Sequence, residues 1–211
     1  MGFVWCGFDT SLYDSSDVGV DEVAMRIAMS KENGHSALGL ENNLVGLRDH
    51  NQLWAELYRE EEKRIMVAVG HLIVDLQHIG STAIPGIKAK PILDMMAGVA
   101  QLEKALLCKA PLETIGYDYI AHAGIANDCV FGKGVVRTHY LHVVEYGAAK
   151  WMDHLCFRDR LRNDAELARA YERLKEELSR KFSNSRAKYH DAKSKFISEV
   201  VAASHPINSD S

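Results

Sequence analysis

Four residues between positions 78 and 98 have the types and spacing needed to bind a phosphate ester. Gly80 lacks a Cβ, so the backbone can turn sharply and bring N–H groups close to an anion, and Ser81 adds a hydroxyl donor. Lys90 supplies a mobile positive charge, and Asp94 is a lone acid in an apolar run. Because burying an acid is costly, Asp94 is predicted either to hold a divalent ion or to form a structural ion pair. A single cavity should reach both Asp94 and Ser81.

The elements that must position these residues are a helix and two strands. Residues 51–69 have helical spacing, with Asn51 as the N-cap and Gly70 as the stop. Residues 72–79 form an apolar strand that leads into the Gly-Ser turn, and residues 91–99 form a second strand that carries Asp94. The order predicted is therefore helix, strand, turn and acid-bearing strand.

The rest of the chain predicts further strands followed by helices. Strands are expected at 44–47, 117–121, 129–132 and 137–144, and helices at 101–115, 151–162, 165–182 and 186–201. Pro111 is expected to break or end the first of these helices early, and Asp164 to cap the third. The predicted class is α+β, with a mixed sheet of five or six strands and a C-terminal helical cap.

Histidines near these strands are further candidates for the site. His78 stands two residues before Gly80 and could donate to a phosphate, or it could be a hydrogen-bonded core histidine. Thr82 follows in the same turn. His139 and His142 are three apart on one strand, so they face opposite sides and cannot share a metal ion. His142 is the one predicted to lie in the pocket.

The C-terminal helices offer cations and an aromatic ring. Arg158 and Arg162 are spaced i, i+4 and project together, so they could bind phosphate oxygens or form a helix surface paired with nearby aspartates. Lys193 lies beside an apolar stripe and could point inward. Tyr189, on the same side of its helix, could stack on a base or pack in the core.

Length, charge and cysteine content narrow the class of protein. The chain has 211 residues and 23.6 kDa, which suits one domain with an appendage. Residues 158–195 contain twelve Lys or Arg against seven Asp or Glu, although the whole chain has a net charge of −4. Because the chain is acidic overall, a small phosphorylated ligand is favoured over nucleic acid. Four dispersed cysteines and no apolar run of about 20 residues predict a reduced cytoplasmic protein without a membrane partner.

Four ordered runs of sequence together resemble the GrpB family. They are HIGSTAIPGIKAKPILDMMAGV, THYLHVVE, FRDRLRNDAELARAYERLKEEL and YHDAKSKFI. That family shares the fold of the polymerase-beta-type nucleotidyltransferases. The resemblance implies a nucleotidyltransferase-like domain over residues 44–203, after a loosely ordered extension at 1–43 and before a tail at 204–211.

The resemblance also implies that the domain binds a nucleoside triphosphate with Mg²⁺ and transfers a nucleotidyl group to a small acceptor. In the superfamily the acids form a D-x-[DE] pair with a third on a later strand, but here Met96 replaces the second acid. Glu145 is the candidate replacement ligand beside Asp94, or a solvated strand-end residue. Catalytic roles fall to Asp94 and Lys90. The residues expected to bind the nucleotide are His78, Gly80, Ser81, Thr82, His142, Arg158, Arg162, Tyr189 and Lys193.

Two other classes of function remain open. Met96 favours a catalytically silent nucleotide-binding or regulatory module that has kept the pocket, whereas Asp94 and Lys90 argue against complete loss of the site. A third possibility is a protein-interaction domain that uses the helical cap as its docking surface.

Overall fold

The computed structural model describes residues 37–121 and 128–204, and most of the expected extension at 1–43 and of the tail at 204–211 lies outside these ranges. The described residues belong to a compact unit that begins at Leu38. Leu38 packs against Trp54 and Leu93, and Leu40 pairs with Arg137. Leu38 and Leu40, which precede Leu44, are thus packed together with the sheet and its helices.

The described chain forms five strands, five α-helices and two 3₁₀ helices. In chain order they are α2 (Leu53–Val69), β1 (Asp75–Ile79), η1 (Ser81–Ala83), β2 (Leu93–Val99), η2 (Leu102–Cys108), α3 (Lys109–Thr114), β3 (Tyr117–Tyr119), β4 (Cys129–Lys133), β5 (His139–Glu145), α4 (Ala149–Asn163), α5 (Ala165–Lys181) and α6 (Arg186–Ala202). None of the helices in the described ranges has both the length and the apolar character needed to cross a bilayer.

The sheet has the order β1-β2-β5-β4-β3. β2 and β5 are parallel and every other neighbouring pair is antiparallel, so the predicted mixed α+β sheet with a C-terminal helical cap is confirmed, with five strands. The α2 helix begins where Asn51 accepts a hydrogen bond from the backbone N–H of Leu53 at 3.0 Å. It precedes β1, which ends at the Gly-Ser turn, and β2 then carries the acid, in the predicted order.

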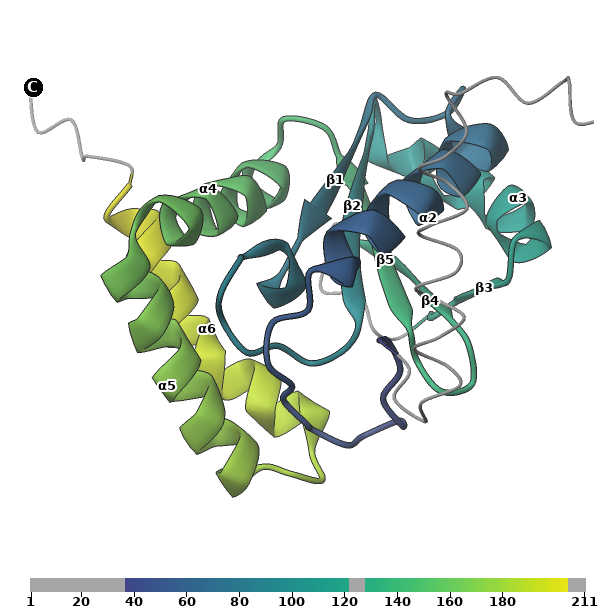
Figure 1. Ribbon diagram of the computed structural model, residues 1–211. Helices are drawn as coiled ribbons and strands as arrows, with labels where there is room; N and C mark the ends of the chain where they lie inside the picture. The colour runs from purple at the N-terminus through teal and green to yellow at the C-terminus, as the bar shows by residue number, and fades with distance from the viewer. Residues whose placement is uncertain (1–36, 122–127, 205–211) are drawn as a thin grey trace, which may run out of the picture. The chain divides into compact units, whose positions relative to one another are not determined.

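The two faces of the sheet have different partners. Because side chains alternate along a strand, Met95 and Leu141 point to one face and pack in the largest apolar cluster with α2 and α3. Asp94, Met96 and His142 point to the opposite face, which we call the site face. Figure 1 shows α4, α5 and α6 gathered on the side of the sheet away from α2 and α3.

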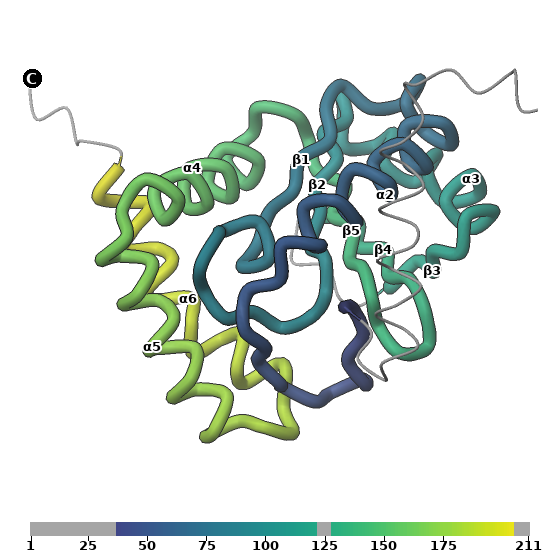
Figure 2. The backbone as a smooth tube through the Cα atoms, in the orientation of Figure 1, coloured from purple at the N-terminus to yellow at the C-terminus, as the bar shows by residue number. Residues whose placement is uncertain are grey.

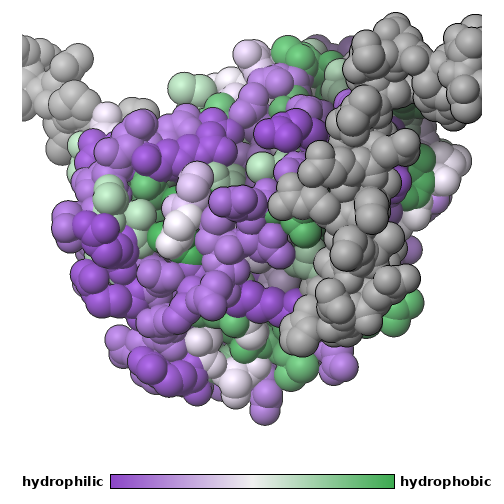
Figure 3. Space-filling view, in the orientation of Figure 1, coloured by the Kyte–Doolittle hydropathy of each residue, from purple (hydrophilic) through white to green (hydrophobic). Residues whose placement is uncertain are grey.

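The segment between β1 and β2 packs against the helices of the C-terminal cap, α4 to α6. Ile84 and Ile87 of that segment pack among Phe157, Tyr171 and Val200 of the three helices. In the tube view of Figure 2 this segment curves out from the sheet toward α5 and α6. The outer surface of the cap is mostly hydrophilic on the face drawn in Figure 3.

Two local predictions differ from the structure. Residues 44–47 are not a strand, because the N–H of Val45 bonds to the carbonyl of Ser183 at 2.7 Å and its side chain packs against Tyr189 instead of a sheet neighbour. The helix expected over 101–115 is broken, as predicted, but Pro111 does not end a helix, since it stands in the first turn of α3, where a missing N–H breaks no helical bond. The break comes earlier, where η2 gives way to α3.

Candidate functional site

A cavity of about 450 Å³ lies between the site face of the sheet and the helical cap. Its polar lining comprises Gly80, Ser81, Thr82, Lys90, Asp94 and His142 on the sheet side, and Lys150, Asp153, His154, Tyr171, Tyr189, His190 and Lys193 on the helix side. The volume is in the range of small-molecule pockets, about 300–1,000 Å³. As the sequence predicted, one cavity reaches both Asp94 and Ser81.

Gly80 brings the turn against Asp94. Its φ of 68° lies in the left-handed region, and a Cβ at this position would stand 2.6 Å from Oδ2 of Asp94. β1 and β2 pair so that Ile79 is opposite Asp94, which sets the turn directly beside the carboxylate. A glycine is therefore required here both by the backbone and by the close approach of the acid.

Lys90 and Lys193 both contact the buried ring of Tyr189. Their ammonium nitrogens are 5.9 and 4.6 Å from the ring centroid. Burial lowers the pKa of Lys90 and of Lys193 to about 8, although the carboxylate of Asp94 acts in the opposite direction on both. Tyr189 is thus a core residue whose ring also supports the two lysines, and the two ammonium groups share a single acid.

The α5 helix supplies the wall beside the Gly-Ser turn. Tyr171 is buried and, like Ser81, lines the cavity. Burial raises the pKa of Tyr171, and the nearby hydroxyl of Ser81 only partly offsets this. Tyr171 therefore remains a neutral phenol beside the serine.

His142 is held by an acid that the sequence analysis did not identify. Its Nδ1 lies 2.9 Å from Oδ2 of Asp128, and Nζ of Lys150 donates to the same oxygen at 2.6 Å. Burial acts to raise the pKa of Asp128, but His142 and Lys150 outweigh it and hold the pKa below its ordinary value. Asp128 is close to His142 because Val130 pairs with His142 across β4 and β5. The only sign of this role in the sequence is that Asp128 is a polar residue directly before a strand.

Two further histidines in the cavity were also missed. Burial lowers the pKa of His154 to about 4. The charge of Lys193, followed by burial, lowers the pKa of His190 to about 3. Both rings are therefore neutral at pH 7, and the positive charge of the cavity comes from lysines.

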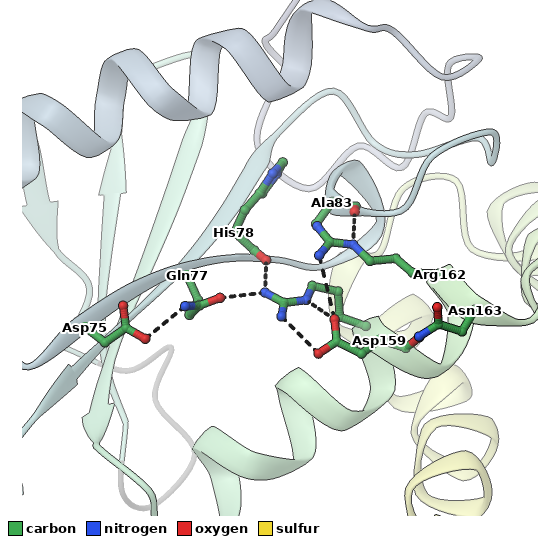
Figure 4. Close-up of polar contacts among 8 residues, drawn as sticks. Asp75, Gln77, His78, Ala83, Asp159, Arg162 and Asn163 are labelled. Atoms are coloured by element: carbon green, nitrogen blue, oxygen red, sulfur yellow. Dashed lines mark hydrogen bonds and ion pairs between the residues drawn. The ribbon is translucent and has the colours of Figure 1, made fainter.

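Arg158 and Arg162 brace the polypeptide around the turn and are not among the residues that line the cavity. Arg158 donates to Oε1 of Gln77 at 2.8 Å and to the carbonyl of His78 at 3.0 Å, and Arg162 donates to the carbonyl of Ala83 at 2.8 Å. Asp159 pairs with both guanidinium groups, as Figure 4 shows. The two arginines thus fix the end of β1 and η1 to α4.

The side chain of His78 points to the face of the sheet away from the cavity. It stacks on Tyr58 with ring centroids 4.7 Å apart, and its Nε2 lies 3.0 Å from Oγ1 of Thr82. Burial, followed by the charges of Arg162 and Arg158, lowers the pKa of His78 to about 3. This neutral core histidine supports Thr82, which does line the cavity.

The predicted metal ligands Asp94 and Glu145 are not brought together. Asp94 is opposite Tyr140 on β5, whereas Glu145 is opposite Val99. A separation of five residues is about 16 Å along a strand, too far for one ion. Met96, where a second acid would stand, is buried in an apolar cluster. Within residues 37–121 and 128–204, no three His, Cys, Asp or Glu side chains are grouped to hold a metal ion.

Comparison with known proteins gives a consistent assignment. A protein-family model described as GrpB protein matches residues 44–203. The Glutamate-rich protein GrpB of Alkalihalophilus pseudofirmus is 34% identical over 170 residues, which cover 78% of this chain and 98% of that protein. The UPF0157 protein SCO7215 of Streptomyces coelicolor is 38% identical over 157 residues, covering 72% and 80%. The crystal structure of the conserved protein GrpB from Enterococcus faecalis has a TM-score of 0.68 and 30% identity, covering 75% of this chain and 96% of that one. The chain belongs to the GrpB family.

Proposed function

We propose that the protein binds a nucleotide in the cavity between the site face and the helical cap, with the phosphates at Lys90 and Lys193. The observation that carries the proposal is the pair of buried lysines that meet at Tyr189 beside one acid. Lys150, the third lysine of the cavity lining, is paired with Asp128, so its charge is already balanced. Two buried ammonium groups beside the single carboxylate of Asp94 suit an anion, and the Gly80–Ser81 turn adds donors for phosphate oxygens.

The depressed lysine pKa values also support an anionic ligand. Burial lowers them because the ammonium groups have lost water. A phosphate placed between the two groups would supply the hydrogen bonds and the counter-charge that water no longer provides. Binding would then favour the protonated lysines and raise their pKa values.

Mg²⁺ is not well matched to the residues present. Mg²⁺ prefers several oxygen ligands in octahedral geometry, and the protein offers one strand carboxylate whose neighbours are cations. An ion that enters with a triphosphate would be held mainly by the phosphates. We therefore propose nucleotide binding that does not depend on Mg²⁺. The protein would then be a nucleotide-binding module that lacks the two carboxylate ligands of a metal site.

Nucleotidyl transfer to a small acceptor is the second candidate. It is favoured by the order of elements that nucleotidyltransferases share, in which α2 precedes β1, β1 ends at the Gly-Ser turn, and β2 presents Asp94. Unlike the metal-independent binder, this reaction requires Mg²⁺ at Asp94 to neutralise the triphosphate.

Thermal unfolding with a panel of nucleoside mono-, di- and triphosphates, in EDTA or in Mg²⁺, separates the two candidates. A nucleotide at 100 times its Kd should add about 2.7 kcal/mol to the free energy of unfolding. We expect this stabilisation in EDTA and its persistence in Asp94→Asn. Lys193→Met should abolish it, whereas Lys195→Met, at a largely exposed lysine of the same helix, should not.

Each other outcome also decides between the candidates. Stabilisation that needs Mg²⁺ and disappears in Asp94→Asn would select the transferase and reject the metal-independent binder. If no nucleotide stabilises the wild-type protein, both candidates are rejected.

A further inference from the structure

Asp128 and His142 form a carboxylate–histidine pair in the cavity wall. The Asp128 side chain is only 3% exposed, and its Oδ2 lies 2.9 Å from Nδ1 of His142. Since an ionised carboxylate can only accept hydrogen bonds, Nδ1 must carry the proton. The other ring nitrogen, Nε2, is then left with a lone pair in the neutral ring. The acid thus fixes both the tautomer and the orientation of the imidazole.

The Nε2 atom is available to a ligand. His142 lines the same cavity as Asp94 and Ser81, and in the described part of the chain no protein group forms a hydrogen bond with Nε2. His142 is opposite Met96 on β2, two residues from Asp94 on the site face. His142 and Asp94 are therefore near neighbours on one face of two paired strands, and both line the cavity in which the phosphate would bind.

We propose that His142 is a general base that removes a proton from an oxygen nucleophile attacking phosphorus of the bound ligand, and that Asp128 is its positioning residue. This inference rests on the nucleotide-binding function proposed above. It adds an activity to that function, the hydrolysis of a phosphate ester or anhydride with water as the second substrate.

The step balances without any other reactant. The water oxygen forms a bond to phosphorus, and its proton moves to Nε2 of His142. The P–O bond to the leaving group breaks, and its electron pair stays on the leaving oxygen, which takes a proton from solvent, while the imidazolium returns its proton to solvent. Lys90 and Lys193 offset the negative charge on the phosphate oxygens, and Asp128 stabilises the transient imidazolium.

The surroundings of His142 are arranged for this role. Lys150 of α4 donates to the same oxygen of Asp128 as His142, which keeps the carboxylate ionised and in place. The ring centroid of His154 lies 6.1 Å from that of His142, and the ring of His190 on α6 is also near enough to interact with it. Both neighbouring histidines are neutral at pH 7, so neither competes with His142 for Asp128 as a charged group.

Turnover of a nucleotide that stabilises the fold tests the inference. The probe is that nucleotide, followed by ³¹P NMR with and without Mg²⁺, in the wild type, His142→Ala, Asp128→Asn and His71→Gln. His142→Ala should lower kcat at least about 100-fold, and added imidazole should restore part of it. Asp128→Asn should lower kcat at least about 10-fold with little change in KM. His71 is exposed and outside the cavity lining, so His71→Gln should behave like the wild type.

The thermal shift distinguishes failure of this step from failure of binding. His142→Ala and Asp128→Asn should still be stabilised by the nucleotide, which also shows that they are folded. If the wild-type protein is stabilised but the nucleotide is not cleaved, or if His142→Ala cleaves it at the wild-type rate, the general base is refuted and nucleotide binding stands. If no nucleotide stabilises the wild type, both proposals fail.

Discussion

Lys193 illustrates how a residue can serve binding at the expense of stability. Its side chain is buried beside a second lysine, and burial lowers its pKa from 10.5 to about 8. The sequence indicated that this lysine lies beside an apolar stripe and could point inward. It could not show that Lys90 would be brought to the same aromatic ring, because that contact depends on how α6 packs over the sheet.

Replacing Lys193 should therefore stabilise the protein without ligand. Between pH 8 and 10.5 the unfolded state holds more protons at this lysine than the folded state, so its contribution to the free energy of unfolding rises with pH across that window. Below pH 8 the buried charge is a penalty. Lys193→Met should gain on the order of 1 to 3 kcal/mol at pH 7 in urea unfolding. The gain should shrink toward pH 10. A lower free energy of unfolding for Lys193→Met at pH 7 would contradict a costly buried charge.

Gly80 provides a second prediction for a single residue. Gly80→Ala would place a methyl group 2.6 Å from the Asp94 carboxylate at a φ of 68°. Strain and overpacking together should cost about 2 kcal/mol or more in urea unfolding. Gly86→Ala is the matched control, because Gly86 has a φ of 81° but no atom within 4 Å of its added Cβ. Equal losses in the two variants would mean that the contact with Asp94 has no special role.

At the scale of elements, the periodic patterns located the strands and helices well. Alternation also placed His139 and His142 on opposite faces, but it did not show that His78 faces away from the cavity. The register between strands was not readable from the sequence. The pairing of β2 with β5 separates Asp94 from Glu145, and the pairing of β4 with β5 brings Asp128 to His142.

The role of α4 was also beyond the sequence pattern. The i, i+4 spacing shows that Arg158 and Arg162 project together, but it does not show what lies opposite them. In the structure, carbonyl groups of β1 and η1 lie there, so the arginines position the turn indirectly. This arrangement ties the geometry of Gly80 and Ser81 to the packing of a helix from the cap.

Arg158→Met should accordingly lower the free energy of unfolding, which the loss of a residue that only binds phosphate would not do. Removing its bonds leaves the buried carbonyl of His78 and the partly buried amide oxygen of Gln77 unpaired, which should cost about 1–3 kcal/mol in urea unfolding. Arg160→Met, at an exposed position of the same helix, should change stability by less than about 0.5 kcal/mol. Unchanged stability combined with lost nucleotide binding in Arg158→Met would instead identify Arg158 as a direct phosphate ligand.

At the scale of the whole molecule, the cavity exists because the helical cap covers one face of the sheet. The sequence showed a basic surplus in residues 158–195. Of the twelve basic residues in that segment, all within the described part of the chain, only Lys193 is among the cavity lining residues. The basic surplus therefore indicated helices that line the cavity but did not show which cation lines it, since most of these cations lie on hydrophilic faces or brace the fold.

Calorimetric titration of the stabilising nucleotide at pH 8.5, in two buffers of different ionisation enthalpy, tests most directly whether buried lysines bind the phosphates. Lys90 and Lys193, with pKa values of about 8, are mostly neutral in the free protein at that pH. If phosphates bind between them, the complex should take up about one proton or more, and Lys193→Met should show neither binding nor uptake. Binding without proton uptake, or with proton release, would contradict the account.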